Sequence, residues 1–475
     1  MSIRPCLILV LLVAGVQVVS VGQDQPPQNP PAQSPGGDDA STRTAPAAAL
    51  STLAGMEPEG GTENTSRDLP SIPALLGGSG ISSAFISELK RSNYLRGGVN
   101  VSAAYDDNPF LASSGATSNT SVSIFPNVSI EESSSRIRWK LGYAGGLTIN
   151  ENLTNQNQNS QNLNFDSQFR LSPHVNLRVA ENFSMITGFF DAGNGGEVVN
   201  GSGGPNASLI APLSTQRSSL TTVETNYHFA LNDLVGASGS FCDLHFTNVP
   251  AGTELTDSQT ASGSAFWLHR IFHGDWGGAS YGFQRITFSP NGEARVNSFL
   301  AVNTLNLSDR FTLSGFVGPQ YLENQGLAPG GMTISQSNTW SVAGGVEAGW
   351  RNQHTSAAAG FSRTISDGGG LSGAVRLQTV HGTFRRELVP GWAAALTASY
   401  GTNQSLVVPT ATSASSINLT SASISLERNV GKSLGLRLGY THDFQQQFGV
   451  PGNPGANRNR VFATLSYQWA KPLGM

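Results

Sequence analysis

The chain has 475 residues, of which 38% are hydrophobic and only 12% charged, and its formal net charge is −4. A soluble globular protein normally carries about twice that share of charged residues. The charge balance also lacks the basic excess of a nucleic-acid-binding protein or of a polybasic membrane anchor. The composition therefore argues against an ordinary soluble domain and predicts no nucleic-acid partner.

The first 22 residues have the pattern of a secretory signal peptide. Arg4 precedes an apolar run over residues 7–19, and small residues at 20–22 provide a cleavage site. A permanent membrane anchor is the weaker alternative, because the run is shorter than the roughly 20 residues that span a bilayer. Cys6 would leave with this leader, so Cys242 would be the single cysteine of the mature chain and no internal disulfide is expected.

Residues 23–70 are rich in Pro, Gly and Ala, and residues 71–92 differ from them. The first segment has too few apolar side chains to offset the entropy of ordering, so we predict a disordered periplasmic linker. In the second, Ile81, Phe85 and Leu89 follow one another at four-residue spacing, which predicts a short amphipathic helix over residues 81–90. Such a helix would cap or enter the periplasmic mouth of a barrel.

The stretch over residues 136–149 gives the strongest indication of fold. Apolar and aromatic side chains occupy one parity and basic or polar side chains most of the other; the first set is Ile137, Trp139, Leu141, Tyr143, Leu147 and Ile149. Successive side chains of a strand point to opposite faces, so this strand has one apolar and one basic face. Similar two-faced segments recur along nearly all of the chain after Tyr94. We therefore predict an all-β protein, a transmembrane antiparallel up-and-down β-barrel over residues 93–475 in a bacterial outer membrane.

The pattern predicts about eighteen strands, an even number as expected for bacterial barrels, with sixteen as the alternative. The expected strands cover residues 94–105, 119–130, 136–149, 162–171, 174–187, 217–230, 234–246, 258–271, 275–288, 294–307, 311–322, 338–350, 354–366, 371–384, 391–403, 415–427, 433–442 and 459–469.

Short and long connections alternate along this series. Short turns on the periplasmic side and long loops outside are the usual asymmetry, so both termini are expected in the periplasm. The longest expected loop, residues 188–216, would either fold inward as a constriction or lie outside the barrel, and its composition favours the outside.

Two short motifs resemble the ends of an uncharacterised bacterial β-barrel porin group. They are Tyr105-Asp106-Asp107-Asn108-Pro109-Phe110, which closes the first strand, and Arg458-Asn459-Arg460-Val461, which opens the last. The resemblance implies outer-membrane transport, in some members associated with exopolysaccharide secretion. Many outer-membrane proteins end on an aromatic residue that the barrel-assembly machinery recognises, whereas here six residues follow Trp469.

A barrel of this size leaves room for an aqueous lumen, so passive or facilitated passage of small polar solutes is the leading functional hypothesis. Basic residues outnumber acidic ones on the expected inward parity, which favours anions or acidic saccharides. The alternative is that these residues only ring the periplasmic rim and pair with Asp166 or with lipid headgroups. The lumen candidates are Arg136, Arg138, Lys140, Asp166, Arg170, Arg178, Arg295, Glu347, Arg376 and Arg437.

Other function classes have weaker support. An export or surface-assembly barrel and a nonconducting structural or adhesive barrel remain alternatives. His354 and Ser356 share one face as in lipid-hydrolysing barrels, but the pattern of outer-membrane phospholipases is missing, so no enzyme activity is predicted. No metal or cofactor motif occurs. The expected partners are outer-membrane lipids, the assembly machinery and a small polar solute or saccharide, and a homo-oligomer is left open.

Overall fold

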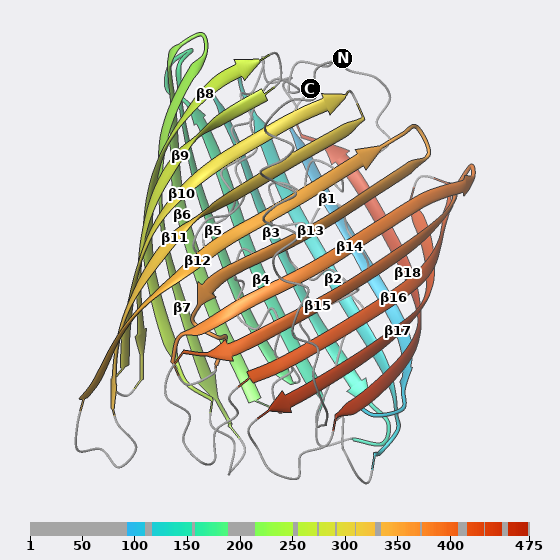
Figure 1. Ribbon diagram of the computed structural model, residues 1–475. Coiled ribbons are helices and arrows are strands. Elements are labelled where there is room, and N and C mark those ends of the chain that lie inside the picture. The colour runs from blue at the N-terminus through green and yellow to red at the C-terminus, as the bar shows by residue number, and fades with distance from the viewer. Residues whose placement is uncertain are drawn as a thin grey trace, which may run out of the picture.

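A computed structural model describes residues 93–109, 116–153, 157–188, 214–249, 255–272, 275–289, 292–308, 310–327, 334–370, 373–406, 416–431, 433–448 and 455–473. These residues form one antiparallel sheet of eighteen strands (Figure 1). The strands are β1 (Tyr94–Asp106), β2 (Asn119–Ser133), β3 (Ile137–Asn150), β4 (Gln158–Arg170), β5 (Val175–Gly188), β6 (Ser214–Ala230), β7 (Asp233–Thr247), β8 (Ser258–Phe272), β9 (Asp275–Phe288), β10 (Gly292–Ser308), β11 (Phe311–Leu327), β12 (Ile334–Arg351), β13 (Thr355–Ser366), β14 (Val375–Val389), β15 (Trp392–Ser405), β16 (Ser416–Val430), β17 (Leu434–Phe448) and β18 (Ala456–Pro472).

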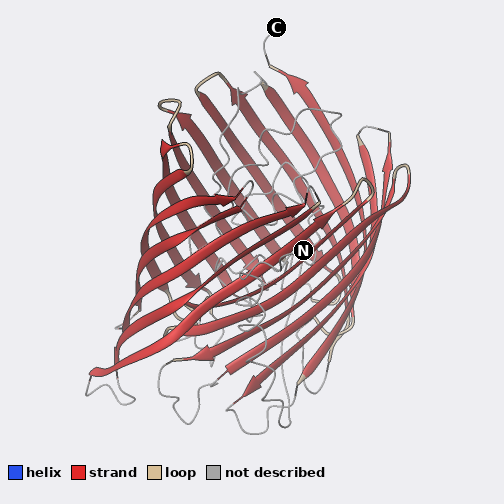
Figure 2. Cartoon of the chain, turned by 45° about the horizontal axis from the view of Figure 1, so that its top comes forward, coloured by secondary structure: helices blue, strands red, loops and turns tan. Residues whose placement is uncertain are grey.

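The sheet closes on itself between its first and last strands. Ala103 of β1 lies opposite Val122 of β2 on one side and Ala463 of β18 on the other. Every strand thus has two antiparallel neighbours, and the ribbon encloses a lumen in both views (Figures 1 and 2). The predicted eighteen-stranded antiparallel barrel is confirmed, and the sixteen-stranded alternative is excluded.

The two ends of the barrel differ in their connections. Tyr94 pairs with Pro472, so β1 begins and β18 ends at the same end, which we call the turn end. Connections there are short, such as residues 231–232 and 390–391, whereas the opposite loop end has connections as long as residues 189–213. One connection at the loop end is also short, namely residues 289–291 between β9 and β10. The predicted loop over residues 188–216 lies mostly outside the described residues.

The predicted alternation of side chains is present in the wall. In β3 the side chain of Ile149 is 51% exposed and that of its neighbour Thr148 is 1% exposed. Large apolar side chains on one parity, including Leu141 and Tyr143, face outward, and small or polar ones face inward. The barrel therefore has an outward apolar surface and an inward face that is largely polar.

The ladder between β12 and β13 is shorter than the others. Residues 344–351 of β12 pair with residues 356–363 of β13, and β12 then extends to Ile334 beyond this registered ladder. The ribbons of β12 and β13 diverge toward the loop end (Figure 1). The end of β13 thus leaves β12, while β13 continues to pair with β14 as far as Ser366 and Val375.

The expected start of the strand at residue 371 is wrong, because β14 begins at Val375 and residues 367–374 form a connection. Gly368, Gly369, Gly370 and Gly373 all have positive φ angles there. Residues with a Cβ adopt such angles at a cost, so this run cannot continue an extended strand. The leader, the linker and the segment over residues 81–90 lie outside the described residues. Within the described part of the chain, no helix is long and apolar enough to span a membrane.

Candidate functional site

Charged side chains on β2 to β6 form an ion-pair network on the inner wall. Arg178 Nη2 lies 2.5 Å from Asp166 Oδ2, and its Nη1 lies 3.4 Å from Glu224 Oε2. Arg178 also donates a 2.7 Å hydrogen bond from Nε to Asp166. Arg138 Nη2 lies 2.7 Å from Glu131 Oε1. These carboxylates offset much of the basic charge that the sequence places on this face.

Lys140 belongs to the same network because its neighbours on both adjacent strands are acidic. It lies opposite Glu131 of β2 and Asp166 of β4. Side chains directly opposite one another in antiparallel strands are close enough for opposite charges to interact favourably. The inner wall from β2 to β6 therefore alternates basic and acidic groups from strand to strand.

A second network lies on β14, β16 and β17. Arg385 Nη1 is 2.6 Å from Glu427 Oε2, and Arg437 Nε is 3.8 Å from Glu427 Oε1. All three side chains lie on the inward parity of their strands, shared with the buried Thr379, Ser425 and Thr441. The Glu427 carboxylate thus lies between two guanidinium groups on the inner wall.

Seven of the ten lumen candidates are inward-facing in the structure. They are Arg138, Lys140, Asp166, Arg170, Arg178, Glu347 and Arg437. Arg136 lies in the turn just before β3 and is exposed. Two candidates, Arg295 and Arg376, lie on the outward parity.

The inward placement predicted for Arg295 and Arg376 is wrong. Arg295 shares the outward parity of the exposed Phe299, and its Nε lies 2.5 Å from Glu293 Oε1. Arg376 shares the outward parity of Val380 and donates a 3.2 Å hydrogen bond to Gln404. Both lie near the loop ends of their strands, where the outward surface passes beyond the apolar region and tolerates charge.

Two acidic members of these networks were missed by the sequence analysis. Glu131 was assigned to a turn because the second strand was expected to end at residue 130, but β2 continues to Ser133. Glu427 was the last residue of an expected strand, and its basic partners lie on other strands. The sequence signal for both residues was the two-residue alternation of the strands. Glu131 lies two residues after Ser129, Glu427 lies two residues after Ser425, and both serines are buried on the inward face.

The connection between β13 and β14, residues 367–374, is described at residues 367–370 and 373–374; we call it the constriction loop, and its described residues lie on the lumen side of the wall. The Ser258 hydroxyl of β8 donates a 3.1 Å hydrogen bond to the Asp367 carboxylate, and the Thr256 N–H donates a 2.9 Å bond to the Gly370 carbonyl. Four strands separate β8 from β13 in the wall. The constriction loop therefore crosses part of the lumen, from the end of β13 to β8.

An apolar cluster holds the base of the constriction loop. Ile365 precedes the loop and Ala374 ends it, and both are buried in one cluster with side chains from the inner faces of β9, β10 and β11, namely Ile286, Phe288, Ala294, Val296 and Leu322. Ile365 is on the outward parity of β13, yet it packs against inward-facing side chains. This contact requires the end of β13 to lie inside the wall, which agrees with its departure from β12.

The tip of the constriction loop packs against β7. A Cβ at Gly370 would lie 2.8 Å from the Phe246 ring and 3.3 Å from Leu255, so the backbone approaches these side chains closely. Phe246 belongs to a buried cluster with Leu244 of β7 and Ile417 of β16, against which Leu255 also packs. Because β7 and β16 stand nine strands apart, this contact narrows the lumen at the loop end.

The buried carboxylate of Asp367 is expected to make docking of the constriction loop depend on pH. Burial raises the pKa of Asp367, and hydrogen bonds from Gly369 N–H and the Ser258 and Ser366 hydroxyls lower it by less. A raised pKa in the docked loop means that the docked state binds protons more readily than a released, solvated loop. Docking is therefore favoured at acidic pH and weakens as pH rises through the raised pKa.

We predict that conductance through this barrel increases with pH for this reason. Asp367→Asn cannot ionise and should hold the low conductance across the range, while Asp233→Asn at the turn end should keep the wild-type pH profile. Single-channel recording between pH 4 and 9 measures both. A wild-type conductance that falls with rising pH, or an Asp367→Asn profile identical to wild type, would contradict the assignment.

The two terminal motifs meet at the closing seam of the barrel. Arg458 of β18 lies 2.7 Å from Asp106 of β1 and 3.3 Å from Asp443 of β17, and all three side chains are buried. Beside them, Asn459 donates bonds of 2.7 and 2.6 Å to Asp107. The motif residues thus tie the first strand to the last two, which gives them a structural role in closure.

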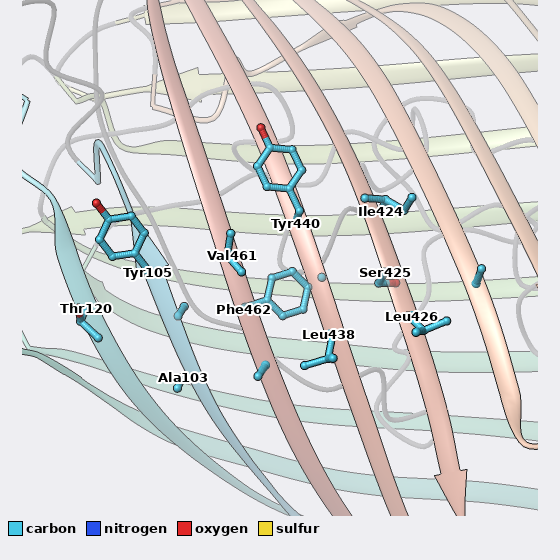
Figure 3. A pocket seen from close by; sticks show the side chains of 14 residues that line it. Ala103, Tyr105, Thr120, Ile424, Ser425, Leu426, Leu438, Tyr440, Val461 and Phe462 are labelled. Carbon is cyan, nitrogen blue, oxygen red and sulfur yellow. The ribbon is translucent and has the colours of Figure 1, made fainter.

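The outward face of the same seam has an apolar depression of about 690 Å³ (Figure 3). Ala103 and Ala463 leave space between the larger Tyr105, Tyr440 and Val461. Its lining is almost wholly apolar, and it lies among the exposed large apolar side chains of the outward surface. It has the character of a surface covered by lipid acyl chains.

The described residues contain one histidine–carboxylate pair beside a serine of the candidate hydrolytic face. His354 Nδ1 lies 3.1 Å from Glu387 Oε2, a carboxylate that the sequence analysis did not anticipate. Among the described contacts, Ser356 has no hydrogen bond to His354, and no group of three or more His, Cys, Asp or Glu residues could hold a metal ion.

No protein-family profile and no curated protein matches the sequence. Solved structures of outer-membrane barrels are similar in overall form. The siderophore receptor PiuA from Acinetobacter baumannii is 9% identical, with a TM-score of 0.40 over 81% of this chain and 82% of that one. The ferric citrate transporter FecA is 6% identical, with a TM-score of 0.46 over 81% and 79%. OpdK from Pseudomonas aeruginosa is 11% identical, with a TM-score of 0.40 over 81% and 100%.

Proposed function

We propose that this protein is an outer-membrane channel that passes small polar solutes through a constricted lumen. The observation that carries the proposal is the division of the wall into an outward apolar face and an inward face lined by paired charges. An outward apolar face suits lipid, and an inward polar face suits water. The constriction loop favours small solutes over a polysaccharide chain, because it crosses the lumen on the way out.

The proposed orientation places the turn end in the periplasm and the loop end outside. It rests on the usual asymmetry of short periplasmic turns and longer external loops. Tyr467 and Trp469 then lie on the outward parity near the periplasmic interface, where aromatic side chains concentrate. Outer-membrane lipids and the assembly machinery are the partners that this orientation implies.

Recording in planar bilayers tests the channel directly. Purified full-length protein that shows the altered gel mobility of a folded barrel is added to one side. Stepwise conductance is expected. Folded protein that inserts into the bilayer and gives no steps would contradict a channel and favour a structural or adhesive barrel.

The paired networks lead us to propose a weak anion preference that depends on the acidic partners. Glu224→Gln removes a carboxylate from Arg178 and should shift the reversal potential in a salt gradient toward anions. Glu181 lies on the outward parity of β5 and accepts a 2.7 Å hydrogen bond from Ser219, so Glu181→Gln is the matched control and should cause no shift. A cation-selective wild-type channel, or equal shifts in both variants, would refute the proposal.

A further inference from the structure

Part of the inner wall is apolar in a barrel whose inner face is otherwise largely polar. We call it the luminal apolar wall, and it comprises Leu234, Phe266, Leu268, Trp276, Leu300, Val302, Phe316 and Ala343 of β7 to β12. These residues form one contiguous cluster, and none is more than 7% exposed. An aqueous lumen is normally lined by polar groups, so this cluster calls for a covering layer.

The cluster is set apart by its apolar composition rather than by its burial, because polar inward-facing residues of other strands are equally buried. Eighteen strands about 4.8 Å apart and tilted by about 40° give a barrel roughly 35 Å across between backbones. At that width the residues that face the cluster from β18 and β1 lie across the lumen, and they are small and polar, including Thr464, Asn100 and Ser102. Removing large apolar side chains from water is favourable, so a segment with a matching apolar face would bind to this surface.

We propose that the luminal apolar wall is the docking site of the N-terminal segment over residues 81–90. Residues 1–92 precede the described part of the chain and join it at Tyr94, at the turn end. The luminal apolar wall lies toward the same end, since Leu234 is the second residue of β7 and Trp276 the second of β9. The segment therefore enters the lumen beside the surface that it would cover.

The length of the segment suits this docking. The helix predicted for residues 81–90 would extend about 15 Å and the three residues before Tyr94 would add about 10 Å, so Ile81 could reach roughly 25 Å from the start of β1. That distance spans the lumen from β1 to the opposite strands once the side chains on both walls are counted. The spacing of Ile81, Phe85 and Leu89 gives the segment one apolar face to place against the wall, with serines on its other face.

Photo-crosslinking from the full-length chain tests this docking. A photoreactive phenylalanine analogue is placed at Phe85, or at Ser83 on the opposite helix face as the matched control, and linked peptides are identified by mass spectrometry. Links from position 85 to β7–β12, with few from position 83, are expected. Links to other strands, to a second copy of the chain or to lipid, or no links at all, would overturn the proposal.

A second measurement reports coverage of the wall without depending on conduction. In a Cys242→Ser background, Ala343→Cys should react slowly with a water-soluble maleimide, and at least tenfold faster after Ile81, Phe85 and Leu89 are all changed to Ser. Changing Ser82, Ser83 and Ser87 to Asn is the control and should leave the rate unchanged. Equal rates in the two triple variants of folded protein would also overturn the proposal.

Discussion

Replacing the constriction loop, residues 367–374, by a two-residue Asn-Gly turn should raise single-channel conductance several-fold. The loop crosses the lumen from β13 to β8, where Asp367 accepts a hydrogen bond from Ser258. An Asn-Gly turn joins antiparallel strands tightly, so β13 and β14 can still pair without the constriction loop. Removing the constriction loop widens the lumen at the loop end. Conductance increases with the open cross-section of the lumen.

The matched control is an Asn-Gly replacement of Pro390 and Gly391 at the turn end. Gly391 already has a positive φ of 81°, so an Asn-Gly turn suits this site, and the connection does not cross the lumen. This variant should conduct as wild type does. Equal conductance in the loop replacement and in wild type would show that the constriction loop does not set the width of the passage.

Arg458→Met should destabilise the barrel by about 3–5 kcal/mol, because it leaves the buried Asp106 and Asp443 without their cation. The variant should unfold at lower urea concentration in lipid vesicles, as followed by tryptophan fluorescence. The lost stability comes from the seam between the first strand and the last two, where the sheet closes.

Arg285→Met is the control for this effect. Arg285 Nη2 lies 2.8 Å from Glu293 in an exposed ion pair on the outward face, and exposed pairs contribute little to stability. Adding Asp106→Asn and Asp443→Asn to Arg458→Met should restore part of the lost stability. If Arg458→Met were no less stable than Arg285→Met, the seam network would not contribute to closure.

The sequence was sufficient to predict the barrel because each strand repeats the same two-residue period. In the stretch over residues 136–149 that period separates apolar from polar side chains, and the structure places them on opposite faces. The strand number followed from counting such segments. Ends of strands were less predictable, since a ladder can continue into polar residues such as Glu131 when the neighbouring strand offers partners.

The constriction loop could not be predicted from local pattern. Residues 371–377 read as a strand because Val375 and Leu377 continue the alternation of β14. What breaks the strand is the packing of Ile365 and Ala374 against side chains of β9 to β11, which are distant in sequence. The run Gly368-Gly369-Gly370 was the available signal, since three successive glycines seldom extend a strand.

The luminal apolar wall could not be predicted from the alternation of side chains either. A strand such as β10 carries Leu300 and Val302 inward and Phe299 outward, so both of its faces are apolar and alternation cannot distinguish them. Arg295 was assigned to the inner face for the same reason, although its register with Arg285 places it outside.

Cross-linking of β8 to the constriction loop tests most directly whether this barrel is narrowed from within. In a Cys242→Ser background, Ser258→Cys and Asp367→Cys replace two side chains that are hydrogen-bonded at 3.1 Å across the lumen. Ser240→Cys with Ser262→Cys, two hydroxyls 2.7 Å apart on adjacent strands, is the positive control. Mild oxidation of folded protein in membranes should link both pairs. A folded barrel in which the control pair links and the Ser258–Asp367 pair does not would contradict the account.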